Sequence, residues 1–135
     1  MRYFVGIDDT DNLESRGTGY VGRTMAELIV ANGLGTTGAI SRHQLLFDPR
    51  VPYTSHNSSL CIEVETSKPD ELLNFMISYL LKACAVDSDC GLCVVDADNV
   101  PASVIEWGKT AKQDLVKQID GLNLAKREGI ILIGL

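Results

Sequence analysis

Hydrophobic and polar residues alternate along this chain with two periods. Apolar runs, or runs in which every second residue is apolar, predict strands at 2–7, 36–47, 59–65, 92–95 and 130–135. Apolar residues that recur every three or four positions predict helices at 18–32 and 69–83, and a C-terminal helical segment made of a helix at about 101–119 and a short one at about 122–128. The order β-α-β-β-α-β predicts an α+β, ferredoxin-like fold: a sheet with two helices on one face, then a C-terminal helical segment and a last strand.

Composition points to one domain that spans residues 1–135, because 45% of the residues are hydrophobic and can form a single core. No signal peptide and no apolar run of about 18 residues is visible, which predicts a soluble, cytoplasmic protein with no membrane partner. The net charge is −6, with 12 basic and 18 acidic residues. That balance argues against a stand-alone nucleic-acid binder, which needs clustered Lys and Arg to contact phosphates.

An acidic motif follows the first predicted strand, which is apolar throughout and is expected to be buried on both faces. Asp8, Asp9 and Asp11 place three carboxylates within a short stretch. Charges about 4 Å apart repel strongly, so this cluster needs wide solvation or a cation. Magnesium suits it, since Mg²⁺ uses one or two carboxylates together with waters and substrate phosphates. The alternative is that these short side chains only form a turn and cap the next helix.

A glycine-rich stretch comes next and opens into a helix. Gly17 and Gly19 flank Thr18 and let the backbone approach another group closely. The start of the following helix presents free N–H groups and the positive end of the helix dipole. A ligand that contains both metal and phosphate would satisfy the acids and the glycines together. We therefore expect a nucleotide or phosphate site here.

Four cysteines raise a separate question. Cys90 and Cys93 have CxxC spacing, but no second CxxC or CxxH completes a zinc site. The two interpretations are a zinc or redox motif and buried free thiols, of which we expect the second. Asp96 and Asp98 could join a metal site, although Asp98 and Asn99 before Pro101 are typical of a helix cap.

Several motifs in order resemble the N-terminal, kinase-like domain of the archaeal tRNA-isoleucine agmatidine synthetases. They are Gly6-Ile7-Asp8-Asp9-Thr10-Asp11, then Gly17-Thr18-Gly19-Tyr20, then Pro52-Tyr53-Thr54 through Asn57, and the strand that ends Ile62-Glu63-Val64. The resemblance covers about residues 4–66. In that family the domain binds ATP with magnesium and phosphorylates an anticodon cytidine before agmatine is attached.

The resemblance implies roles for individual residues. Asp8, Asp9 and Asp11 would hold magnesium, with Asp8 and Asp9 also catalytic. Thr18 would lie at the phosphate-facing helix start, between Gly17 and Gly19. In that family a threonine at the helix start is phosphorylated, so Thr18 is either a nucleophile or only a ligand and cap. Asn57 would lie in the ATP pocket. The family's usual basic residues are missing from the loop before Asn57, which leaves His56, Arg50 and Arg42 as substitutes.

Other function classes stay open. An aspartyl-phosphate phosphatase would use Asp9 and Asp11 as a nucleophile-and-acid pair, but that class requires a parallel, doubly wound sheet. A non-enzymatic module that senses nucleotide or metal is the other alternative. The phosphate acceptor is not identified by the sequence, and tight tRNA binding by this chain alone is not expected. The apolar last strand indicates an edge strand, a homo-oligomer or protein contact, or a native sequence that continues.

Overall fold

A computed structural model describes residues 1–8, 18–44, 58–84, 90–113 and 117–135. Its strands form one sheet in the spatial order β2-β3-β1-β4-β5, and every neighbouring pair is antiparallel. The strands are β1 (Arg2–Asp8), β2 (Thr36–Gln44), β3 (Ser58–Glu65), β4 (Gly91–Asp96) and β5 (Ile131–Gly134). The first four strands have the ferredoxin-like order, so the predicted α+β fold is confirmed, and β5 extends the sheet beside β4.

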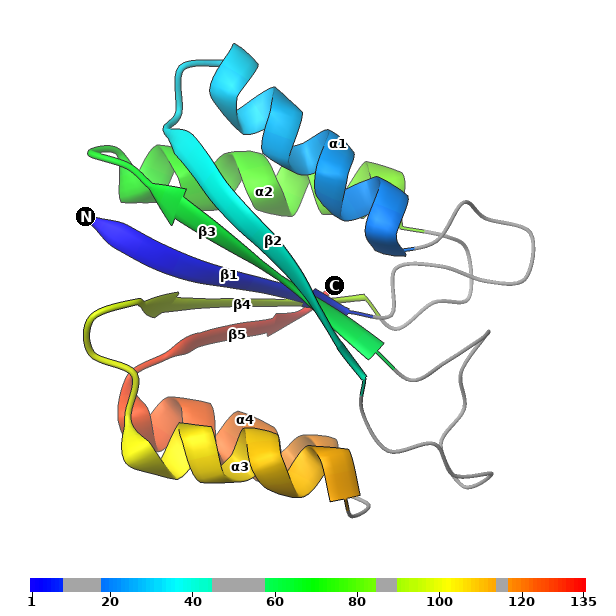
Figure 1. The fold of residues 1–135 in the computed structure, drawn as a ribbon, viewed down its shortest axis with the longest axis vertical. Helices are drawn as coiled ribbons and strands as arrows, with labels where there is room; N and C mark the ends of the chain where they lie inside the picture. Colours follow the sequence, from blue (N-terminus) through cyan, green and yellow to red (C-terminus); the bar gives the residue numbers. More distant parts are fainter. Residues whose placement is uncertain (9–17, 45–57, 85–89, 114–116) are drawn as a thin grey trace.

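Two helices cover one face of this sheet: α1 (Thr18–Ala31) and α2 (Pro69–Ala83) (Figure 1). Antiparallel partners share a face, so the register joins Ile7 to Leu60 on one side and to Leu92 on the other. These side chains meet the apolar stripes of both helices. The fully buried residues of this core include Val5, Ile7, Met25, Ile29, Ile62, Leu72, Met76, Leu80 and Leu92.

The opposite face of β1 is more open than its apolar sequence indicates. Val5 and Ile7 are buried, whereas Phe4 and Gly6 between them are only half-buried. The prediction of burial on both faces is therefore wrong: α1 and α2 cover only one face of the strand, and the elements on the other face leave Phe4 and Gly6 half-buried.

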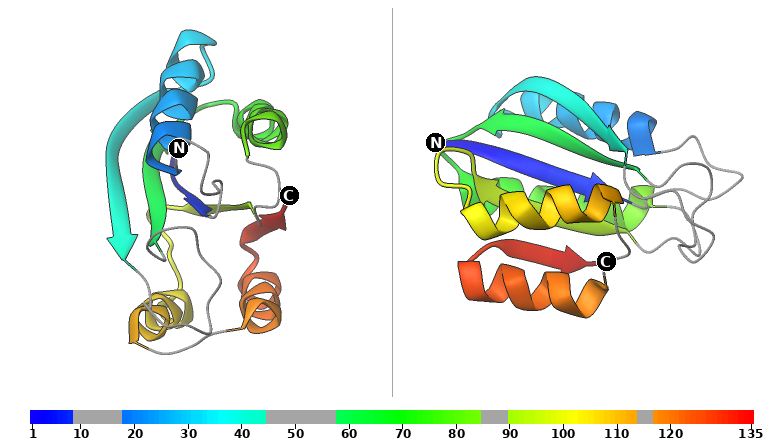
Figure 2. Two further views of the ribbon diagram at one scale, coloured as in Figure 1. Left: turned by 90° about the vertical axis from the view of Figure 1, so that its right-hand side faces the viewer. Right: turned by 60° about the horizontal axis from the view of Figure 1, so that its bottom comes forward.

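Two further helices lie on that opposite side: α3 (Ala102–Gln113) and α4 (Gln118–Glu128) (Figures 1 and 2). The two helices predicted at about 101–119 and 122–128 are both present, although α4 already begins at Gln118. Gly129, with a φ of 68°, ends α4 in the left-handed conformation that glycine adopts without strain. No described residue of α3 is buried, whereas α4 buries Leu124 and Ala125.

The start of α2 is held by Thr66, one residue before Ser67, where the sequence predicts a capping box. A capping box at Ser67 fits the sequence, but the structure shows no side-chain cap at Lys68. Instead the buried hydroxyl of Thr66 accepts a hydrogen bond from the Lys68 N–H at 2.9 Å and donates to the Leu34 carbonyl at 2.6 Å. Thr66 thereby ties α2 to the turn before β2. Among the described residues, none of the helices is long and apolar enough to cross a membrane.

Candidate functional site

Asp8 is the last residue of β1 and lies exposed at one end of the sheet. The register pairs it with Ser59 of β3 and with Gly91 of β4. A Cβ built on Gly91 would lie 2.6 Å from Oδ1 of Asp8, so the glycine leaves the room that the carboxylate occupies. The Asp8 carboxylate therefore lies at the end of the central strand β1, with the backbone of β4 beside it.

The start of α1 is held close to the same end of the sheet (Figure 1). A Cβ built on Gly22 would lie 2.6 Å from Cδ1 of Leu60 and 3.3 Å from Cδ1 of Ile7. This close approach is possible because residue 22 has no side chain. Since Ile7 directly precedes Asp8, the packing brings the first turns of α1 near the end of β1.

Several predicted site residues cannot be compared with the structure. Asp9, Asp11, Gly17, His56 and Asn57 lie outside the described residues, as does Arg50. Thr18 and Gly19 are the first two residues of α1, which agrees with the predicted helix start. The structure thus places Asp8 and the backbone of Thr18 at one end of the sheet, while the remaining roles stay predictions.

Arg42 belongs to the edge strand β2 and pairs with Leu60. Leu60 in turn pairs with Ile7, so Arg42, Leu60 and Ile7 form one row across three strands on the face that α1 covers. Arg42 is exposed, whereas the other two are buried. An arginine is always charged and matches phosphate geometry. Whether Arg42 replaces the basic residue that the sequence lacks before Asn57 stays a prediction.

The next row on the opposite face contains residues that the sequence alone did not bring together. His43 pairs with Ser59, which pairs with Asp8. The Nε2 atom of His43 and Oγ of Ser41 are 2.9 Å apart and hydrogen-bonded. His43 lies within β2, inside the strand predicted at 36–47. The sequence could reveal that His43, Ser59 and Asp8 lie in one row only if the register of β2 against β3 were known.

The cysteines behave differently from either expectation. Cys84 and Cys90 form a disulfide with Cα atoms 6.3 Å apart, so the prediction of free thiols is wrong for these two. Cys61 and Cys93 remain free. Burial, followed by the neighbouring Cys61 and Asp8, raises the pKa of Cys93 to about 11, so this thiol stays protonated near neutral pH. Within the described ranges, no group of three or more His, Cys, Asp or Glu side chains is arranged to hold a metal ion.

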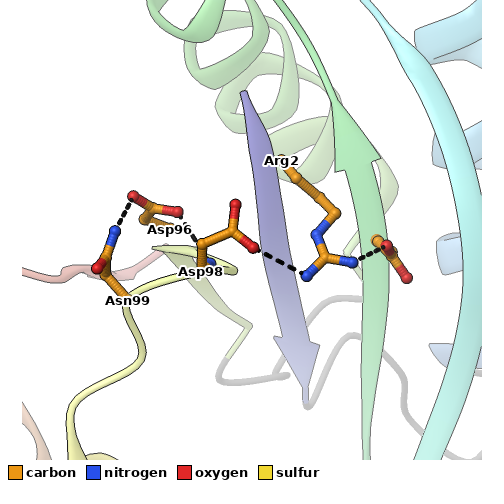
Figure 3. Close-up of polar contacts among 5 residues, drawn as sticks. Arg2, Asp96, Asp98 and Asn99 are labelled. Atoms are coloured by element: carbon orange, nitrogen blue, oxygen red, sulfur yellow. Dashed lines mark hydrogen bonds and ion pairs between the residues drawn. The ribbon is translucent and has the colours of Figure 1, made fainter.

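A second polar cluster lies at the other end of β1 (Figure 3). The Arg2 guanidinium donates to Glu63 at 2.9 Å and to Asp98 at 3.1 Å. Asp96 accepts hydrogen bonds from the Asn99 side chain at 2.8 Å and from the Asp98 N–H at 3.0 Å, and these hold the pKa of Asp96 below its usual value. The predicted cap at Asp98 and Asn99 is therefore wrong, because both residues form a turn that ties β4 to β1.

Sheet topology also decides one open alternative. An aspartyl-phosphate phosphatase of the doubly wound class needs a parallel sheet. All strand pairs among the described residues are antiparallel. This alternative is therefore excluded.

Comparison with solved structures extends the likeness to the whole chain. A crystal structure of a tRNA fluorescent labeling enzyme matches with a TM-score of 0.88 at 24% identity over 100% of this chain. The complex of TiaS with an isoleucine tRNA and ATP matches with a TM-score of 0.88 at 24% identity over 99% of the chain. Apo TiaS, an agmatidine synthetase that acts on an isoleucine tRNA, matches with a TM-score of 0.83 at 21% identity over 99%.

The chain spans about a third of those structures, since it covers 32% of each of the three. No protein-family model matches the sequence. None of the curated proteins matches it either. The protein therefore has a TiaS-like fold, and the resemblance found in residues 4–66 is confirmed at the level of the fold.

Proposed function

We propose that this chain is a magnesium-dependent, ATP-binding phosphotransfer domain of the tRNA-modifying kind, related to the kinase-like part of TiaS. The observation that carries the proposal is that β1 ends at Asp8 and α1 begins at Thr18 at the same end of a TiaS-like sheet. Support also comes from the solved TiaS complexes, one with an isoleucine tRNA and ATP and one with the same tRNA, AMPCPP and agmatine.

The residues at this end fit a hard cation. Asp8 offers an exposed carboxylate with room beside Gly91, and the sequence adds Asp9 and Asp11 directly after it. Oxygen donors of this kind suit Mg²⁺, which also takes waters and phosphate oxygens. When bound, magnesium would neutralise charge on the phosphates. These three carboxylates would hold it.

The rest of the proposed chemistry needs position and charge. Phosphoryl transfer requires little covalent help from a protein and depends on stabilising the charge of the moving group. The N–H groups at the start of α1 and the guanidinium of Arg42 would supply positive charge on the side of the sheet that α1 covers. Thr18, the first residue of α1, would be the hydroxyl that accepts a phosphate.

The proposal is tested by calorimetric titration of the protein with ATP in the presence of magnesium, and again with a chelator. Saturable, magnesium-dependent binding at one site supports it. A folded sample that binds no ATP with magnesium contradicts it. Incubation with ATP followed by mass spectrometry then tests whether Thr18 gains a phosphate.

Arg42→Gln should weaken binding of magnesium-ATP about fivefold and affect adenosine binding little. An exposed cation against a phosphate is worth about 1 kcal/mol, because solvent screens it. Calorimetry with ATP and adenosine measures both effects. Arg127→Gln is the matched control, since it removes the same charge from an exposed position on α4. Equal affinity of Arg42→Gln and Arg127→Gln for ATP would contradict a phosphate role.

The isolated chain should bind tRNA weakly. Tight binding depends on neutralised phosphates, and 12 basic residues are outnumbered by 18 acidic ones. We expect no saturation below about 10 μM at near-physiological salt. Fluorescence anisotropy with labelled tRNA measures this. Saturable binding in the low micromolar range would contradict this expectation and show that the chain binds tRNA by itself.

A non-enzymatic sensing module remains the second candidate function. It is favoured by the exposed position of Asp8 and Arg42, which leaves the site open to solvent. The two candidates differ in one result. A sensing module binds magnesium-ATP but yields neither ADP nor phosphorylated Thr18.

A further inference from the structure

The disulfide between Cys84 and Cys90 joins two elements at the end of the sheet that carries Asp8. Cys84 directly follows α2 as its C-cap, and its N–H donates to the Leu80 carbonyl at 2.9 Å. Cys90 directly precedes β4. The two residues are six positions apart in sequence. The bond therefore fastens the beginning of β4 to the end of α2.

Two contacts connect Cys90 to the end of the sheet that carries Asp8. Its neighbour Gly91 pairs with Asp8 and lies against the Asp8 carboxylate. Its own carbonyl accepts a hydrogen bond from the Leu135 N–H at 2.9 Å, just beyond β5. The backbone at Cys90 thus sets the position of β4 beside Asp8 on one side and of the chain after β5 on the other.

The two cysteine residues differ in their exposure to solvent. Cys90 is 2% exposed and belongs to the core, whereas Cys84 is half-buried at its margin. A soluble thiol can therefore reach the sulfur of Cys84 more easily than that of Cys90. Cys61 and Cys93 lie on the other face of the sheet, in register with Gly6. Burial raises the pKa of both free thiols, which disfavours attack by them on the disulfide.

We propose that Cys84 and Cys90 form a reversible thiol–disulfide site. Its oxidation state controls how often the backbone opens at the end of the sheet that contains Asp8 and Leu135. The oxidised pair fixes β4 to α2. The reduced pair leaves Cys90 held only by its packing and backbone hydrogen bonds. The consequence for ATP rests on the proposed function: the oxidised form should bind magnesium-ATP more tightly, because Asp8 is held in place.

The exchange reaction is balanced with a dithiol as reductant. One thiolate of the dithiol attacks Sγ of Cys84, which breaks the bond to Cys90 and forms a mixed disulfide. The Cys90 thiolate takes a proton. The second thiol of the reagent then attacks its own mixed disulfide, releases Cys84 as a thiol and closes the oxidised reagent. Two electrons and two protons pass from the dithiol to the protein.

The first test counts thiols and follows hydrogen exchange in the full chain. After treatment with oxidised glutathione and removal of the reagent, alkylation under denaturing conditions should label two cysteines, Cys61 and Cys93, and reduction with dithiothreitol should raise the count to four. Amide exchange at residue 91 and at Leu135 should become about tenfold faster after reduction. Four free thiols in the oxidised sample, or identical exchange in both states, would overturn the proposal.

Two variants separate the clamp from a general effect of losing a cysteine. Cys84→Ser should exchange at residue 91 and Leu135 like reduced wild type under both conditions. Cys61→Ser is the matched control, a half-buried free cysteine on β3, and should keep the wild-type response. A redox response retained by Cys84→Ser would overturn the proposal. If wild type binds no ATP in either state, the proposed function fails, while the thiol count and exchange rates still decide this inference.

Discussion

Asp8→Asn should weaken magnesium-ATP binding more than about tenfold while leaving thermal stability unchanged or slightly raised. A neutral amide is a poor ligand for Mg²⁺ compared with a carboxylate, and removal of one charge from an acidic motif relieves repulsion with Asp9 and Asp11. The side chain is exposed, so the substitution creates no cavity in the core. Calorimetry measures the affinity, and thermal unfolding measures the stability.

Asp98→Asn is the matched control for this substitution. Asp98 is also an exposed carboxylate, with 68% of its side chain accessible, but it lies at the opposite end of β1 and pairs with Arg2. It should bind ATP like wild type. If Asp8→Asn binds ATP normally and loses much stability, the motif is a structural turn and the proposed site is wrong.

The second large effect concerns the core that positions the site. Ile62→Ala should lower the free energy of unfolding by about 3 kcal/mol, because it leaves a cavity in the middle of the sheet. Ile62 is 0% exposed and pairs with Val5 on the central strand. For a domain of this size, the expected decrease in Tm is about 10 °C. Thermal or denaturant unfolding followed by circular dichroism measures it.

Ile40 provides a close control for that experiment. It pairs directly with Ile62 and lies on the same face of the sheet, but it is 38% exposed at the edge strand. Ile40→Ala should cost less than about 1 kcal/mol, because its environment is already open to solvent. Equal losses for the two variants would show that the core is not centred where the structure places it.

The fold was predictable because its core follows simple periods. Leu60, Ile62 and Val64 alternate along β3, and all three are buried. Met25, Ile29, Leu72, Met76 and Leu80 follow helical spacing and are buried as well. One face of a strand or one stripe of a helix is buried in the core, so its apolar residues recur with the period of that element. The more open face of β1 could not be predicted, because Phe4 and Gly6 are apolar in sequence but only half-buried in the structure.

Contacts between distant segments were not predictable in the same way. The register that brings His43 and Ser59 into line with Asp8 depends on how β2 and β3 pair, and a shift of one residue would reverse the faces. The disulfide is a local pair, six positions apart, but the CxxC spacing of Cys90 and Cys93 gives no sign that Cys90 pairs with Cys84 instead. The turn at Asp96 to Asn99 was interpreted as a helix cap, since the same hydrogen-bonding side chains favour both.

The placement of the end of β1 and the start of α1 was predictable, whereas the roles of the residues there stay predictions. Asp8 and the start of α1 at Thr18 lie at the same end of the sheet, as the sequence predicted. The roles of Asp9, Asp11, His56 and Asn57 stay predictions, because these residues lie outside the described ranges. The resemblance to TiaS holds for the fold, and magnesium, ATP and the phosphate acceptor are the parts that experiment has to establish.

The most direct measurement replaces Mg²⁺ with paramagnetic Mn²⁺ and follows the amide signals of the labelled protein by NMR in the presence of ATP. The account predicts that broadening is strongest at Asp8, at Gly91 and in the first turn of α1. It should be weak at Asp96 to Asn99, in the second polar cluster at the other end of β1. Broadening centred on Asp96 to Asn99, or none that depends on ATP, would contradict a magnesium-nucleotide site at the end of β1.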